Sequence, residues 1–125
     1  MGTRSLTFIY EEKNTLNPLL TIYRQYDGYP TGHGRELANI LCENVINANG
    51  MGCLAATIVA RLKESPYNIY IVPSHTEEAG QDFEYHVYPD KVTIIDFKYD
   101  GRKTIFNGSY PQLLEYCMIE HYEEQ

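Results

Sequence analysis

The chain has 125 residues, of which 43% are hydrophobic and 22% charged, and its formal net charge at pH 7 is −7. This length suits one domain with one hydrophobic core, and no apolar run is long enough to predict a membrane span. The excess of acidic residues makes nucleic acid an unexpected partner, although two or three converging cations suffice to bind a small anion. Because the start of the chain lacks the pattern of a secretory signal and Cys42, Cys53 and Cys117 form no paired motif, we expect a cytoplasmic protein without disulfides.

Two short alternating segments, residues 6–10 and 19–25, predict strands that are joined through the polar stretch 11–18. We expect these strands to form a hairpin. In that pairing Arg4, at the start of the first strand, lies beside Arg24 at the end of the second. The sequence therefore predicts that two arginines meet at one end of the sheet.

Apolar residues at helical spacing predict a first helix over about 33–47 and a second that follows the glycine-rich break at 49–52 and ends before Ser65. Segments 69–72, 83–88, 92–99 and 104–106 predict four more strands. The last two flank the Asp100-Gly101 hairpin signal. Ser109 is expected to cap a final helix that carries Leu113, Leu114, Cys117 and His121 on one stripe. The predicted order ββααββββα indicates an α+β fold, an antiparallel sheet with its helices on one face.

The segment 23–34, Tyr-Arg-Gln-Tyr-Asp-Gly-Tyr-Pro-Thr-Gly-His-Gly, is the densest in chemistry. Arginine offers forked donors and a helix start offers free amides, so Arg4, Arg24 and the turn Gly32-His33-Gly34 are predicted to bind phosphate. The alternative is that Arg24 pairs with Asp27 or Glu36 and the glycines only make a tight turn.

The three tyrosines of this segment are Tyr23, Tyr26 and Tyr29. They are candidates for stacking on a base, with Asp27 accepting hydrogen bonds from a ribose. The alternative, given equal weight, is that these tyrosines line the core and a subunit interface, since tyrosine is enriched in both places. The polar segment 74–82 is read either as a lid or, preferentially, as a solvated connector.

Catalytic and metal sites are not predicted from the sequence. The four histidines lie in separate segments, there is no His-Glu-x-x-His helix, and no Cys pair has the spacing of metal ligands. Cys117 and His121 are four residues apart, but a buried thiol near a histidine is far commoner than a reactive pair. We therefore assign no catalytic residue, no metal and no cofactor.

The run Met-Gly-Thr-Arg-Ser-Leu-Thr at residues 1–7, the segment 23–34, Gly-Cys-Leu-Ala-Ala at 52–56 and Ile-Tyr-Ile-Val-Pro at 69–73 resemble a family of small, largely uncharacterised bacterial and phage proteins. That resemblance carries no established activity or catalytic residue. In size, acidity and lack of catalytic motifs the chain is also similar to phage proteins that sequester nucleotide-derived immune signals, an analogy at the level of general properties.

These observations lead to three hypotheses. The first is a non-enzymatic homo-oligomer that binds a nucleotide-like small molecule, such as an ADP-ribose derivative or a cyclic nucleotide, in a bacterial host cell. The second is an enzyme that degrades such a ligand with His33 as acid or base. The third is an interaction module that uses a tyrosine-rich surface.

Overall fold

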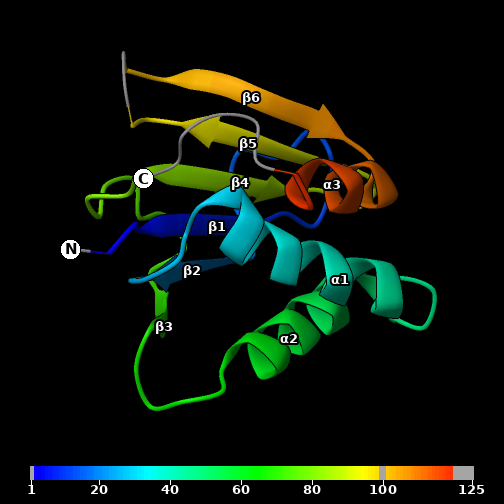
Figure 1. Ribbon diagram of the computed structural model, residues 1–125. Helices are drawn as coiled ribbons and strands as arrows, with labels where there is room; N and C mark the ends of the chain where they lie inside the picture. The colour runs from blue at the N-terminus through cyan, green and yellow to red at the C-terminus, as the bar shows by residue number, and fades with distance from the viewer. Residues whose placement is uncertain (1, 99–100, 120–125) are drawn as a thin grey trace.

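One mixed sheet organises the residues described by this computed structural model, 2–98 and 101–119, with strand order β3-β2-β1-β4-β5-β6 (Figure 1). The strands are β1 (Ser5–Ile9), β2 (Leu20–Arg24), β3 (Ile69–Val72), β4 (Phe83–Val87), β5 (Val92–Asp96) and β6 (Lys103–Gly108). A π-helical turn, η1 (Pro30–Gly34), leads into α1 (Arg35–Asn44), which is followed by α2 (Gly50–Leu62) and, after β6, by α3 (Tyr110–Cys117). The predicted α+β class and the order of strands and helices are confirmed.

The predicted first hairpin is present, and its register places Ser5 opposite Arg24 and Ile9 opposite Leu20. The predicted last hairpin is present as β5 and β6, with Asp96 opposite Lys103. Asp100, half of the turn signal that predicted this hairpin, lies outside the described residues.

The expectation of an entirely antiparallel sheet is wrong at one pair, because β1 and β4 run parallel with Ser5 beside Phe83. The cause is the connector 73–82, which leaves β3 at one end of the sheet and returns across its face to the other. The hydroxyl of Thr21 donates to the carbonyl of Ser74 near the beginning of this connector. The amide of Asp82 donates to the carbonyl of Arg4 at its end. Strand β4 therefore begins at the same end of the sheet as β1.

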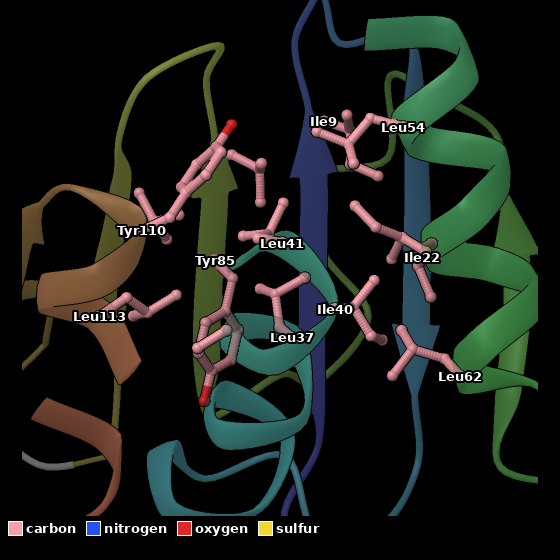
Figure 2. Packing of buried hydrophobic residues seen from close by; sticks show 14 of the residues in the cluster. Ile9, Ile22, Leu37, Ile40, Leu41, Leu54, Leu62, Tyr85, Tyr110 and Leu113 are labelled. Atoms are coloured by element: carbon pink, nitrogen blue, oxygen red, sulfur yellow. The ribbon is translucent and has the colours of Figure 1, made fainter. Parts of the chain in front are cut away.

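All three helices cover the same face of the sheet, as predicted, and the main core fills the space between them (Figures 1 and 2). Alternate residues of each strand point to this helix-covered face, and the apolar stripes of the helices meet them. Burying each large aliphatic or aromatic side chain contributes about 1.5–3 kcal/mol. Members of this core include Ile9, Ile22, Leu37, Leu41, Leu54, Ile58, Tyr85, Ile94 and Leu113.

The opposite face of the sheet, called here the second face, carries a smaller apolar cluster of Leu6, Phe8 and Tyr10. Ala79 of the connector packs against it. The connector reading of 74–82 thus has a structural basis, since this segment covers the strands it crosses.

Local signals explain where the helices begin. Ser109 accepts a hydrogen bond from the amide of Gln112, and the Gln112 side chain accepts one from the amide of Ser109, which completes a capping box at α3. The predicted cap is therefore confirmed, while His121 lies outside the described residues. Helix α1 begins later than predicted because residues 30–34 form the π-helical turn, and it ends at Asn44, a few residues earlier than predicted. No described helix is long and apolar enough to cross a membrane.

Candidate functional site

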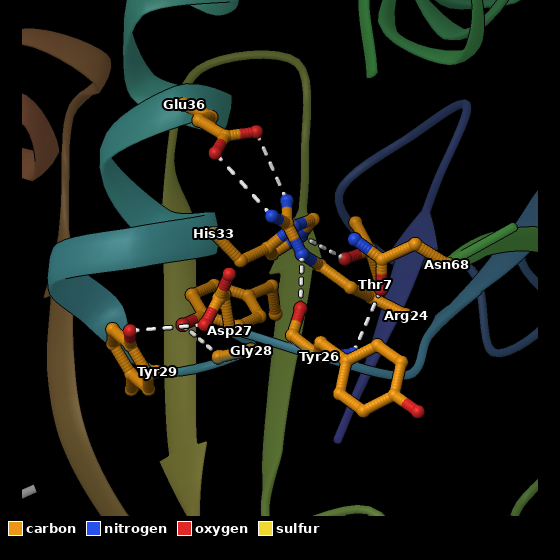
Figure 3. A network of polar contacts seen from close by, with 10 residues as sticks. Thr7, Arg24, Tyr26, Asp27, Gly28, Tyr29, His33, Glu36 and Asn68 are labelled. Carbon is orange, nitrogen blue, oxygen red and sulfur yellow. Dashed lines mark hydrogen bonds and ion pairs between the residues drawn. The ribbon is translucent and has the colours of Figure 1, made fainter. Parts of the chain in front are cut away.

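Arg24 is the centre of a polar network at the end of β2, under the start of α1 (Figure 3). Its side chain is only 6% exposed and makes a forked contact with Glu36, from Nη1 to Oε1 at 3.0 Å and from Nη2 to Oε2 at 3.3 Å. Its Nε donates to the carbonyl oxygen of Tyr26 at 2.6 Å. The guanidinium is thus engaged inside the protein, as in the alternative interpretation in which Arg24 pairs with Glu36.

His33 is completely buried beside Arg24, with both ring nitrogens engaged. Nδ1 lies 3.3 Å from Nη1 of Arg24, and Nε2 lies 2.7 Å from Oγ1 of Thr7. Because arginine can only donate, Nδ1 must accept, so the hydrogen of the neutral ring sits on Nε2 and is donated to Thr7. Burial, and next the charge of Arg24, lower the pKa of His33 to about 3. A histidine held neutral and enclosed in this way is poorly placed to act as an acid or base.

The glycine turn that follows is also occupied by its own chain. The amides of Gly32 and Gly34 both donate to the carbonyl of Tyr29, and that of His33 donates to the carbonyl of Asp27. A Cβ on Gly34 would lie 2.7 Å from the sulfur of Cys117, so only glycine fits here without a shift of its neighbours. The backbone that was predicted to cradle phosphate therefore closes a tight strand-to-helix turn.

The tyrosines of this segment do not gather into one platform. Tyr23 packs against the second-face cluster and lies near Tyr70, with ring centres 6.1 Å apart. Tyr29 packs against the main core, and its hydroxyl donates to Asp27 at 3.1 Å. Tyr26 is 48% exposed at the surface. Tyr23 and Tyr29 thus belong to different faces of the sheet.

Arg4 is separated from Arg24 for the same reason. The two backbones lie where the hairpin argument placed them, but neighbouring strand positions point to opposite faces. The guanidinium of Arg4 lies against Gly80 of the connector, and its buried Nε has no hydrogen-bond partner among the described residues. The expectation that both arginines converge on one anion is therefore corrected: the structure brings together Arg24, Asp27, Tyr29 and the turn at 32–34, and leaves Arg4 apart.

A cavity of about 330 Å³ lies on the second face. Its base is formed by Phe8, Tyr10, Glu84 and His86, from β1, the residue after it, and β4. Its walls come from the loops at 16–18 and 74–77, with Arg102 beside them. We call it the second-face cavity. Its volume is at the lower end of the range of about 300–1,000 Å³ that is typical of small-molecule sites.

A hydrogen-bonded chain runs through the base of this cavity. Nε2 of His86 lies 2.9 Å from Oε1 of Glu84, and Nδ1 lies 2.8 Å from the hydroxyl of Tyr10. Gln81 donates to the other oxygen of Glu84 at 2.9 Å. Burial alone raises the pKa of Glu84, but the hydrogen bonds from His86 and Gln81 outweigh it and hold that pKa below its ordinary value. Burial, and then the nearby Tyr88 and Glu84, raise the pKa of Tyr10, so its phenol keeps its proton.

Two side chains at the rim of the second-face cavity have no hydrogen-bond or ion-pair partner among the described residues. Arg102 and His75 both line the cavity, and neither makes a hydrogen bond or ion pair with the residues described. The charge of Arg102 acts on Glu84 without a direct contact. Among the described residues, the cavity thus combines one buried carboxylate with a cation and an imidazole that have no hydrogen-bond or ion-pair partner.

Other hollows offer less chemistry for recognition. A groove of about 450 Å³ between α2 and β3 is lined by apolar residues such as Leu20, Val59 and Ile71, and lacks polar groups to orient a ligand. Another, between α1 and α2, is lined by three glutamates and Arg61. Within residues 2–98 and 101–119 no three His, Cys, Asp or Glu side chains are grouped to hold a metal ion.

The sequence contains one pattern that indicates part of the second-face cavity. Glu84, His86 and Tyr88 alternate along one predicted strand, so their side chains must share one face. Their partner Tyr10 directly follows β1, and the parallel pairing of β1 with β4, which was not predicted, brings it beside them.

Comparison with known proteins adds no family assignment. No family model, curated protein or solved structure matches the chain.

Proposed function

We propose that this protein is a non-enzymatic binding protein for a small phosphorylated, nucleotide-like molecule, and that the second-face cavity is its site. One observation carries this proposal. Arg102 and His75, which have no hydrogen-bond or ion-pair partner among the described residues, line the same cavity as the buried hydrogen-bonded chain on its floor. Arginine binds phosphate through forked, charge-assisted hydrogen bonds, and Glu84 can accept from hydroxyl groups of a sugar. The cavity volume of about 330 Å³ favours a ligand of mononucleotide size.

In a bacterial cell such a protein would act by holding a nucleotide-derived signal, such as a cyclic mononucleotide or the mononucleotide end of an ADP-ribose derivative, away from its receptor. Sequestration requires affinity and enclosure, and does not require a nucleophile or a metal. We further propose that the protein acts as a homo-oligomer, which light scattering on the purified protein measures directly.

An enzyme is the second candidate, and the chain Tyr10–His86–Glu84 is the observation that favours it. A histidine oriented by a carboxylate is a common arrangement for general acid–base catalysis. In this alternative the acid–base role passes from the enclosed His33 to His86, which lines a cavity.

One experiment separates these functions. The protein is incubated with a panel of AMP, ADP-ribose, cyclic AMP and adenosine, freed of unbound ligand and heat-denatured, and the supernatant is analysed by mass spectrometry. Recovery of an intact phosphorylated member supports binding without turnover, whereas an altered product supports the enzyme. If no member is recovered or changed, both are rejected and the interaction module becomes the leading hypothesis.

The residues are tested by calorimetry on the member that binds. Arg102→Ala removes the available cation and is expected to weaken binding by about 10- to 100-fold, the value of one or two charge-assisted hydrogen bonds. Lys103→Ala is the matched control because it removes the same charge from the next, exposed position, which does not line the cavity. Equal losses in both variants would show that net charge, and not the cavity, determines binding.

A further inference from the structure

We propose that the second-face cavity binds its anion together with a proton, which His86 takes up, and that Tyr10 converts this proton into a hydrogen bond to the ligand. This inference rests on the proposed function, because it concerns the same cavity. The ligand is expected to place a negative charge next to Tyr10, and its affinity is expected to depend on pH.

The neutral form of His86 has only one consistent arrangement of hydrogens. The ionised carboxylate of Glu84 can only accept, so Nε2 of His86, at 2.9 Å, carries the ring hydrogen. Nδ1 must then accept from the hydroxyl of Tyr10 at 2.8 Å. In this state the only hydrogen of Tyr10 is directed at the imidazole and is not available to a ligand.

Protonation of His86 reverses one of these bonds. Both ring nitrogens then carry hydrogen, so Nδ1 donates to the oxygen of Tyr10 and the phenol hydrogen is released. Tyr10 lines the cavity, and its raised pKa keeps the hydroxyl protonated. The released hydrogen can then be donated to an oxygen of a bound anion, while the imidazolium adds a positive charge close by.

Aromatic and charged side chains from several segments lie around His86. Phe8 of β1 stacks on the ring of His86, with the two ring centres 4.8 Å apart. Glu84 of β4 contacts the ring at Nε2, and Arg102 lines the same cavity. From the connector, His75 and Glu77 face the same cavity and carry opposite charges when both are ionised.

Tyr88 stacks on Tyr10, and the ammonium group of Lys91 lies over the Tyr88 ring. An anion beside Tyr10 gains the released hydrogen bond only when both ring nitrogens of His86 carry hydrogen. By linkage, the anion must bind more tightly to the protonated form, so its affinity falls as the pH rises.

The test is titration calorimetry of the full chain with AMP as the probe and adenosine as the neutral comparison. Proton uptake is obtained at pH 7 from the difference between two buffers of unlike ionisation heat. We expect uptake of up to one proton with AMP, and an affinity that falls at least tenfold between pH 6 and 8. His86→Gln should abolish the uptake, whereas Lys103→Ala, at an exposed position outside the cavity, should retain it.

Tyr10→Phe is the second variant, since it keeps the stacked ring and removes only the hydroxyl. It should weaken AMP about tenfold at pH 6 and leave adenosine unchanged, in line with the loss of one hydrogen bond to a charged group. AMP binding without proton uptake, or uptake that survives in His86→Gln, overturns this inference while the proposed function stands. If AMP and the other panel members do not bind, the proposed function fails first and this inference with it.

Discussion

Acid is expected to destabilise this protein through His33 before most of its carboxylates titrate. The buried ring, which accepts from Arg24 and donates to Thr7, has a pKa of about 3 against an ordinary value of 6.5. Between these two values the unfolded chain binds a proton that the folded protein does not. The stabilising effect of neutral His33 is therefore complete above about pH 6.5 and is lost progressively as the pH falls toward 3.

The size of the effect follows from the two pKa values. Between pH 7 and pH 5 the loss from His33 alone is about 2 kcal/mol, and its slope approaches about 1.4 kcal/mol per pH unit at the lower end. That is a considerable part of a typical unfolding free energy of about 5–15 kcal/mol. Glu84 contributes further only at lower pH, because its folded-state pKa lies below the ordinary carboxyl value of 4.5.

The assay is urea unfolding followed by circular dichroism at pH 7, 6 and 5. His33→Gln is the informative variant, since its amide can still donate toward Thr7 but cannot take up a proton. We expect the wild-type free energy of unfolding to fall by about 2 kcal/mol over this interval and that of the variant to stay nearly level. His75→Gln, altered in an exposed loop, should retain the wild-type slope. A variant that is as sensitive to acid as the wild type would refute the assignment of a neutral, enclosed His33.

Four further substitutions test the polar network, the packing of two glycines and the cap of α3. Arg24→Ala should lower the free energy of unfolding in urea by about 2–4 kcal/mol, because it leaves a buried imidazole nitrogen and a carbonyl without donors. Gly34→Ala brings a Cβ to 2.7 Å from the sulfur of Cys117 and should cost about 1–3 kcal/mol, while Gly52→Ala, with nothing within 4 Å, should be neutral or stabilising by up to about 1 kcal/mol. Ser109→Ala removes the cap of α3 and should lower the thermal midpoint by an amount equivalent to about 1 kcal/mol.

The elements of the fold were readable from the sequence where one local pattern determined them. The helices followed from apolar stripes, and the register of the first hairpin followed from two alternating segments around a polar turn. The parallel pairing of β1 with β4 was not readable, because alternation gives the faces of a strand but not its direction. That direction depends on the connector 73–82, which crosses the second face before β4 begins.

The role of the segment 23–34 could not be predicted from its own residues for a different reason. Arginine, histidine, glycine and tyrosine in close succession are the residues of a recognition loop, and they are also those of an interior polar network. Which of the two they form depends on whether partners from elsewhere meet them. Here Glu36 meets Arg24 from α1 and Thr7 meets His33 from β1, so the network closes on itself.

Arg24 on the helix-covered face and Arg102 on the second face are therefore expected to have different roles, one in stability and one in binding, and two substitutions test this difference. On the helix-covered face the donors of Arg24 are directed at Glu36, His33 and Tyr26, so its loss should appear in stability. On the second face Arg102 has no hydrogen-bond or ion-pair partner among the described residues, so its removal leaves no described group unpaired. Arg102→Ala should keep the thermal midpoint of the free protein and lose affinity for AMP, whereas Arg24→Ala should lower the midpoint. If Arg102→Ala instead lowered the midpoint and left binding intact, the assignment of the ligand to the second face would have to be abandoned.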